Sequence, residues 1–190
     1  PAEHVLLFQA DSVVCSGGGG AAYLEGLLGL DLVGAPWRQG DCPPDNDRSV
    51  SLCAGDFEDM AEAAYGLPYH EYQRRRQGAD GSRPVGVGGN GGLSLRRRSK
   101  MLEVVTECRG YESMSWNEDV FFSYPCPEVA MRLPTLEEAS AFCVESGPAH
   151  PAPFATHKPW RHRPLDQLAA LAAACPELAP LAALTGVVLP

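Results

Sequence analysis

Long apolar runs are missing from this sequence of 190 residues, and no pattern of basic, then apolar, then small residues opens it. The sequence therefore shows neither a membrane-spanning segment nor a signal peptide, although an anchor further upstream stays open. Positive charge is scarce, because 15 Lys and Arg face 24 Asp and Glu, for a net charge of -9. Such a chain has no field that attracts nucleic acid or an anionic membrane, so no nucleic-acid partner is expected.

C-x-x-C pairs are also missing, although the chain has seven cysteines. This spacing argues against a structural zinc site and against a dense disulfide scaffold. Cys42 and Cys53 can pair within one loop, which would suit a lumenal compartment. Free buried thiols are the favoured alternative, because cysteine often behaves as a small core hydrophobe. The location therefore stays open between the Golgi or ER lumen and the cytoplasm.

The hydrophobic pattern predicts an α/β fold with a mixed, mostly parallel sheet flanked by helices. Residues 4–8 form a continuous apolar run, which is typical of a central strand buried on both faces. A sheet that begins with its most buried strand lacks earlier strands, so we expect the chain to be the C-terminal part of a longer protein. Residues 1–164 are predicted to form the core, and the Ala/Leu pattern at 165–190 predicts a terminal helical segment.

An acid follows the first predicted strand directly, at Asp11. Open α/β sheets bind ligands at the carboxyl ends of their strands, and a carboxylate there can hold a hard divalent ion against a diphosphate. A turn-forming or capping role for Asp11 is an equally weighted alternative. Gln9 shares the same strand face but is a poor metal ligand, so it is better suited to contacting a ribose or a metal-bound water.

Four glycines surround Asn90 in the run Gly88-Gly89-Asn90-Gly91-Gly92. The glycines allow a ligand to approach the backbone closely, and the Asn90 amide is suited to sugar hydroxyls. The run lacks the lysine and hydroxyl of a P-loop and the spacing of a dinucleotide fingerprint. A mobile hairpin without a ligand is the alternative.

Two further polar motifs follow later in the chain. Glu118 and Asp119 open a predicted helix and point about 100° apart, so one can deprotonate an acceptor hydroxyl while the other orients it. His157 is a good ligand for manganese-like ions beside a carboxylate, and Lys158 can meet diphosphate charge. Ordinary helix-start acids and a surface histidine are the alternatives, and each is favoured when its residue is considered alone.

Taken together, five motifs resemble a domain-of-unknown-function family placed near the GT-A glycosyltransferases of the galactosyltransferase-like kind, in its C-terminal part only. The motifs are Leu7-Phe8-Gln9-Ala10-Asp11-Ser12, Val33-Gly34-Ala35-Pro36-Trp37, Gly89-Asn90-Gly91-Gly92-Leu93-Ser94-Leu95-Arg96, Asn117-Glu118-Asp119-Val120-Phe121-Phe122 and His157-Lys158-Pro159-Trp160. The resemblance implies a metal-dependent transferase that uses a nucleotide-sugar, with a UDP-sugar favoured, Mn²⁺ or Mg²⁺ as cofactor, and a glycan or other hydroxyl acceptor.

The resemblance also implies roles for individual residues. Asp11 matches the second acid of the D-x-D motif, Asp119 the base of inverting members and His157 the last metal ligand. Gln9 stands where the first acid of that motif is found in the family. The substrate-binding residues implied are Gln9, Trp37, Gly89, Asn90, Gly91, Gly92 and Lys158, with Glu118 placed beside the base.

Two functions remain in competition after the motifs are combined. The leading hypothesis is an inverting glycosyltransferase, and the rival is a catalytically inactive GT-A-like carbohydrate-binding or scaffold domain. A metal-dependent phosphodiesterase is less favoured, because such sites gather more His and Asp ligands. The enzyme hypothesis requires Asp11 and His157 to lie close together, with Asp119 near the same cleft.

Overall fold

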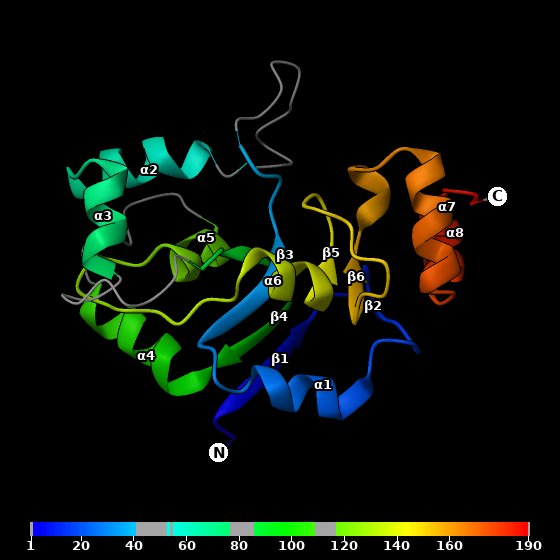
Figure 1. Cartoon of the computed structure of the whole chain (residues 1–190), viewed down its shortest axis with the longest axis horizontal. Helices are drawn as coiled ribbons and strands as arrows, with labels where there is room; N and C mark the ends of the chain where they lie inside the picture. The colour runs from blue at the N-terminus through cyan, green and yellow to red at the C-terminus, as the bar shows by residue number, and fades with distance from the viewer. Residues whose placement is uncertain (1, 41–52, 54, 77–85, 109–116, 190) are drawn as a thin grey trace.

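The computed structural model describes residues 2–40, 53, 55–76, 86–108 and 117–189, and these residues form an α/β fold, as predicted. Two three-stranded sheets lie side by side near the middle of the molecule (Figure 1). The strands are β1 (His4–Phe8), β2 (Ser12–Val14), β3 (Leu32–Pro36), β4 (Gly89–Arg97), β5 (Cys143–Val144) and β6 (Ala155–His157).

The prediction of a mostly parallel sheet is wrong, because most of the strand pairings are antiparallel. The first sheet has the order β1-β4-β3, and both pairings are antiparallel. The second has the order β2-β6-β5, in which β2 pairs antiparallel with β6, and only β5 and β6 run parallel. A continuous apolar run indicates burial but not strand direction, because direction is set by which distant segment the strand meets.

The apolar run at residues 4–8 had indicated a strand buried on both faces, but the first strand is exposed. In the described sheet β1 occupies one edge, and Leu6, Leu7 and Phe8 are exposed, Phe8 by 56%. The central strand is β4, which pairs with β1 on one side and with β3 on the other. The buried character expected of residues 4–8 belongs instead to β3, where every residue from Leu32 to Pro36 is buried.

Helices cover the sheets and extend to either side of them (Figure 1). They are α1 (Gly20–Leu27), α2 (Asp56–Tyr65), α3 (Tyr69–Arg76), α4 (Arg98–Glu107), α5 (Glu118–Ser123), α6 (Leu136–Phe142), α7 (Leu165–Ala174) and α8 (Leu178–Leu184), with a 3₁₀ turn η1 (Pro159–Arg161). In Figure 1, α2 and α3 lie on one side of the molecule, and α7 and α8 lie on the other, beside the second sheet. No helix in the described part of the chain is long and apolar enough to cross a membrane.

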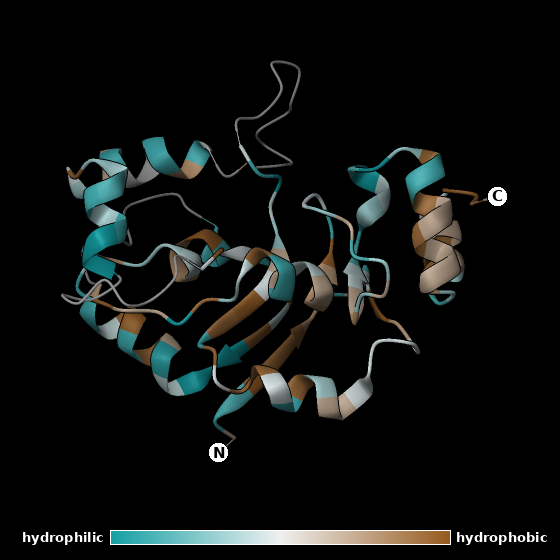
Figure 2. Cartoon of the chain, viewed as in Figure 1, coloured by the Kyte–Doolittle hydropathy of each residue, from teal (hydrophilic) through white to brown (hydrophobic). Residues whose placement is uncertain are grey.

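A hydrophobic core joins the first sheet to α1 and α6. Leu93 and Leu95 of β4 pack there with Phe142 at the end of α6 and with Phe154 and Ala155. Burying a side chain of this size contributes roughly 1.5–3 kcal/mol relative to leaving it in water. Figure 2 shows the contrast between the hydrophobic strands of this sheet and the hydrophilic α3. The core fixes β4 firmly between its neighbours.

The cysteines do not follow the expectation of free buried thiols. Cys15 is bonded to Cys175 and Cys108 to Cys126, while Cys143 is free and buried. Cys42, for which pairing with Cys53 was the alternative considered, lies outside the described residues. The first pairing could not be predicted from the sequence, because its two cysteines are separated by 160 residues.

The Cys15–Cys175 bond connects the second sheet to the C-terminal helices. Cys15 directly follows β2, and Cys175 directly follows α7. Leu171 of α7 and Leu178 of α8 pack on Val144 of β5 in a separate hydrophobic cluster. The helical segment expected at 165–190 therefore contains α7 and α8, which pack against β5, the neighbour of the strand that carries His157.

Candidate functional site

The glycine run is part of a strand and not a mobile hairpin. Residues 89–92 form the first four positions of β4. At Gly89 a Cβ atom would lie 2.6 Å from the Gly34 carbonyl carbon on β3, so the two backbones pass too close for a side chain. Only glycine permits this approach. The run therefore brings bare backbone to the middle of the first sheet, where other segments can contact it.

Gly92 brings the run against His157. The ring of His157 is fully buried, and a Cβ atom at Gly92 would collide with it. Ser12 pairs with His157 across β2 and β6, and its hydroxyl donates a hydrogen bond to the Gly92 carbonyl (3.0 Å). The backbone N–H of Gln9 donates to the same carbonyl (2.8 Å). Two strands of the second sheet and the glycine run therefore meet at one point.

The structure brings Asp11 and His157 together across 146 positions of sequence. His157 Nε2 lies 3.2 Å from Asp11 Oδ1. The backbone N–H of Lys158 donates to the Asp11 carbonyl (2.9 Å), which holds the two segments side by side. The His157 side chain is buried, whereas 40% of the Asp11 side chain is exposed. The pair thus faces solvent through its carboxylate.

Asp119 contacts the residue of the glycine run that precedes Gly92, which is Gly91. Its Oδ2 accepts a hydrogen bond from the N–H of Gly91 (3.1 Å), and its Oδ1 accepts one from the N–H of Val120 (2.8 Å). Burial raises the pKa of Asp119 and the nearby Glu118 carboxylate adds to the rise, while the two backbone N–H groups oppose it. Each oxygen keeps a second lone pair, so the carboxylate can still accept a proton.

The carboxylate of Glu118 pairs with an arginine, although its charge still acts on Asp119. Its carboxylate forms an ion pair with Arg96 (2.6 Å), in which the Arg96 side chain is 7% exposed and that of Glu118 is 57% exposed. The Nε of Arg96 also donates to the Ser94 hydroxyl (2.9 Å). Glu118 therefore holds the buried guanidinium of β4.

One acid of the site, Glu145, was missed by the sequence analysis. Its carboxylate is buried, and its Oε1 lies 3.2 Å from His157 Nδ1, 3.7 Å from Lys158 Nζ and 3.8 Å from His162 Nε2. Burial lowers the pKa of His162, and the Glu145 charge opposes that change. The available signal was the position of Glu145 directly after Val144, the last residue of the short buried strand β5.

The donor set of Asp11 and His157 fits a divalent cation as a pair. Metal–ligand bonds of about 2.1 Å place two neighbouring ligand atoms about 3 Å apart, close to the observed separation of Oδ1 and Nε2. The opposite nitrogen of His157 faces a carboxylate, an arrangement common for ligating histidines. Across the described ranges, no group of three or more His, Cys, Asp and Glu side chains is gathered for a metal.

The other predicted substrate-binding residues are placed differently. Gln9 has an exposed side chain beside the Asp11 turn, and Asn90 uses its side-chain oxygen to accept from the Gly92 N–H (2.8 Å). Lys158 adopts a left-handed backbone (φ 32°) and directs its ammonium toward Glu145. Trp37 does not contact the Asp11–His157 pair in any recorded interaction of the described chain, and its ring packs on Phe57 with centroids 4.6 Å apart.

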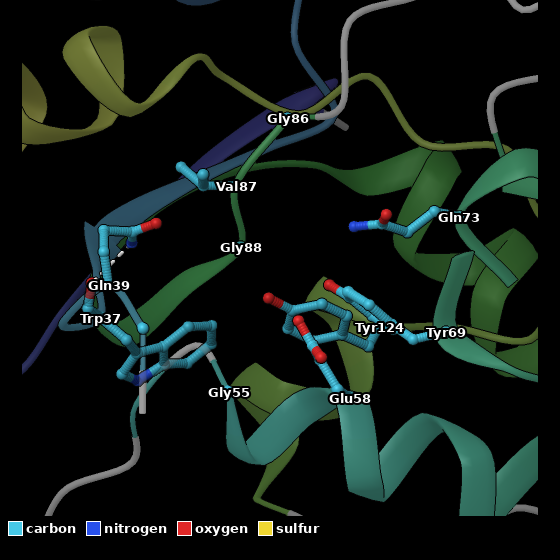
Figure 3. A pocket seen from close by; sticks show the side chains of 11 residues that line it. Trp37, Gln39, Gly55, Glu58, Tyr69, Gln73, Gly86, Val87, Gly88 and Tyr124 are labelled. Atoms are coloured by element: carbon cyan, nitrogen blue, oxygen red, sulfur yellow. Dashed lines mark hydrogen bonds between the residues drawn. The ribbon is translucent and has the colours of Figure 1, made fainter. Parts of the chain in front are cut away.

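Trp37 instead lines a cavity of about 330 Å³ at the start of β4 (Figure 3). Gly88, which precedes β4, forms part of the wall, and Tyr124, which follows α5, forms another part. The cavity wall is therefore continuous in the chain with β4, which contacts Asp119, and with α5, which carries it. No motif in the sequence marks its tyrosines, because they come from separate helices.

The comparisons with known proteins identify a family. A family model described as a protein of unknown function, DUF5672, matches residues 1–157. The chain belongs to this family. The DUF5672 match contains Asp11, the glycine run, Asp119 and His157, and it ends before Lys158, α7 and α8. No curated protein and no solved structure matches the DUF5672 chain.

Proposed function

We propose that this DUF5672 chain is a metal-dependent glycosyltransferase core that moves a sugar from a nucleotide-sugar to a hydroxyl acceptor with inversion. The observation that carries the proposal is that two consecutive glycines each contact a candidate site residue. Gly92 lies against His157, which pairs with Asp11, and Gly91 binds Asp119. The contacts of the Asp11–His157 pair and of the buried Asp119 carboxylate with adjacent residues of β4 support the proposal.

Asp119 acts as the general base in this proposal. The acceptor hydroxyl oxygen forms a bond to C1 of the donor sugar as its proton moves to the Asp119 carboxylate. The bond between C1 and the diphosphate oxygen breaks, and its electron pair leaves with the nucleoside diphosphate. The raised pKa of Asp119 brings it closer to neutral pH, which suits a base. Turnover should consequently fall as the pH drops through a value above 3.8, the usual value for Asp.

Asp11 and His157 would hold the divalent ion, Mn²⁺ or Mg²⁺. When bound, the ion supplies neutralising positive charge for the departing diphosphate. Asp11 offers an exposed carboxylate and His157 a nitrogen fixed by burial, with Glu145 behind its ring. Two protein ligands leave room for diphosphate oxygens and water, a common arrangement for Mg²⁺ at phosphate sites.

The GT-A resemblance supports these roles of Asp11, His157 and Asp119. The chain differs from the GT-A pattern in two respects. Gln9 replaces the first acid of the D-x-D motif, and the first sheet is antiparallel. Gln9 favours a catalytically inactive carbohydrate-binding domain as the second candidate, because it removes one carboxylate from the metal side of the site. The two candidates differ in turnover and not in sugar binding.

The experiment titrates Mn²⁺ and a panel of UDP-sugars into the protein and measures binding by calorimetry and UDP release with hydroxyl acceptors. Asp11→Asn and His157→Ala should lose metal-dependent donor binding. Asp119→Asn should bind the donor normally and lose turnover by roughly 10²- to 10⁴-fold, the usual contribution of a general base. Asp11 is partly exposed, so its variant gives a result even where loss of the buried His157 ring unfolds the protein.

Glu118→Gln is the control, because it neutralises the adjacent acid, which already pairs with Arg96. It also removes a charge that raises the pKa of Asp119, so its turnover is compared at neutral pH. It should leave donor binding unchanged and turnover within a few-fold of the original. Equal activity in all four variants would exclude the assigned roles. Donor or sugar binding with no turnover under any metal would select the inactive domain.

A further inference from the structure

The cavity beside β4 is built against a rigid aromatic wall. Phe57 stacks on Tyr124 with ring centroids 4.5 Å apart and packs on Trp37 at 4.6 Å. The hydroxyls of Tyr65 and Tyr72 donate to the carbonyls of Tyr124 (2.6 Å) and Pro125 (2.7 Å). These contacts fix the wall before any ligand arrives, so binding there would require little ordering of the protein.

Arg76 adds to this support from behind. Its guanidinium lies 5.3 Å from the ring centre of Tyr72 and 5.7 Å from that of Tyr124. It also donates a hydrogen bond to the Ser123 carbonyl (2.9 Å) at the end of α5. The charge of Arg76 is thus used within the wall, and Arg76 does not line the cavity.

Polar groups enter the cavity from several elements. In Figure 3 the hydroxyls of Tyr69 and Tyr124, the amide of Gln73 and the carboxylate of Glu58 point toward the same open space. Gln39 donates its Nε2 hydrogen to the Trp37 carbonyl (2.9 Å), which leaves its side-chain oxygen as an acceptor. Burial raises the pKa of Tyr69 and raises that of Tyr124 well above its usual value, so both hydroxyls stay protonated donors at neutral pH.

This lining selects a neutral, polyhydroxylated ligand. The one charged side chain among the described lining residues is Glu58, an acid, which disfavours phosphates, nucleotides and other anions. Amides, hydroxyls and a carboxylate can exchange several hydrogen bonds with vicinal hydroxyl groups, and aromatic rings supply apolar contact area. The volume of about 330 Å³ lies near the lower end of ligand pockets, which span about 300–1,000 Å³. One sugar ring fits these features.

The cavity and Asp119 are connected through α5. Asp119 is the second residue of α5, and Tyr124 directly follows that helix. Five residues of helix span about 7.5 Å along its axis. A disaccharide bridges such a separation, with one ring in the cavity and the next beside Asp119.

We propose that this cavity binds a neutral sugar unit of the acceptor, adjacent to the unit whose hydroxyl reacts. The inference rests on the proposed function for the role of acceptor. The binding of the sugar itself depends only on the cavity. Binding is therefore measured without nucleotide and in the presence of EDTA, so that metal and donor play no part in the result.

The test follows binding of neutral methyl glycosides and disaccharides to the protein by calorimetry and by ligand-observed NMR. Gln73→Ala and Tyr69→Phe each remove hydrogen-bonding groups from the cavity and should weaken binding by about tenfold. Glu58→Gln, at an exposed position that folding tolerates, should weaken it several-fold. Gln167→Ala is the matched control, because it removes the same amide from the exposed face of α7. This control should leave the affinity unchanged.

Two outcomes overturn the inference. One is the absence of saccharide binding at millimolar concentrations in the folded protein, and the other is binding that the three cavity variants leave unchanged. Asp119→Asn separates this inference from the proposed function, because it should retain saccharide binding while losing turnover. Saccharide binding that depends on the cavity, with no transferase activity, would leave the cavity assignment standing and remove its role in catalysis.

Discussion

At the scale of single residues, the site depends on positions where no side chain fits. Gly91 would place a Cβ atom 3.1 Å from that of Asp119, and Gly92 would place one against His157. Asp11, Asp119 and His157 were all named from the sequence, because acids after strands and at helix starts are local signals. Glu145 was missed, because its importance comes from three basic side chains, those of His157, Lys158 and His162, that only the fold brings to it.

Gly92→Ala tests the contact between the glycine run and His157. The added methyl must displace a fully buried ring, so we expect a loss of about 1–3 kcal/mol in the free energy of unfolding, the usual cost of overpacking. Mn²⁺ binding should weaken at the same time, because His157 is moved from Asp11. Urea denaturation and calorimetry measure the two effects.

Gly26→Ala is the control for this substitution. Gly26 lies in α1, and a Cβ atom there meets nothing within 4 Å. Alanine should leave Mn²⁺ binding unchanged and should stabilise the helix by up to about 1 kcal/mol. A Gly92→Ala protein with unchanged stability and metal affinity would show that the close contact is not required.

At the scale of elements, β4 and α5 are held together by the contacts of one arginine, Arg96, called here the clamp, which the sequence did not reveal. Arg96 of β4 pairs with Glu118 of α5, and its guanidinium lies 5.3 Å from the ring centre of Phe122 in the same helix. The start of α6, in contrast, is a local feature: Thr135 and Glu138, within four consecutive residues, form a capping box with both of its hydrogen bonds. Local hydrogen bonds follow from spacing, whereas a clamp between elements needs their packing.

Arg96→Ala should cost more stability than Glu118→Gln. Removal of Arg96 leaves a void and takes away the partners of Ser94, Glu118 and Phe122, so we expect a loss of about 2–3 kcal/mol. Glu118→Gln changes an exposed carboxylate and should cost less than about 1 kcal/mol. Urea unfolding of both variants measures the difference, and equal losses would contradict the clamp.

At the scale of the whole molecule, one covalent bond joins distant parts of the chain. Cys15–Cys175 links β2, which pairs with the strand of His157, to the end of α7. Cys108–Cys126 closes a much shorter loop between α4 and the segment after α5. Both bonds contradict the expectation of free thiols, because cysteine composition alone does not indicate which residues meet.

Removal of the longer-range bond should have the larger effect on stability. By loop-closure entropy, Cys15→Ser with Cys175→Ser should lower the free energy of unfolding by about 5 kcal/mol, against about 3 kcal/mol for Cys108→Ser with Cys126→Ser. Denaturant titrations of the two double variants, under non-reducing conditions, provide the comparison. An equal or smaller loss for the first pair would show that its loop is already constrained by packing.

The sequence alone determined the α/β class, the start of α5 and the chemistry-bearing residues Asp11, Asp119 and His157. These features arise from local periodicity and from residue types whose chemistry does not depend on the fold. Only the tertiary structure decided strand direction, the exposed position of β1, the disulfide partners, the place of Glu145 and the aromatic cavity. The physical reason is that each of these depends on contacts between segments far apart in the chain, and their free energy is set by packing that no local pattern records.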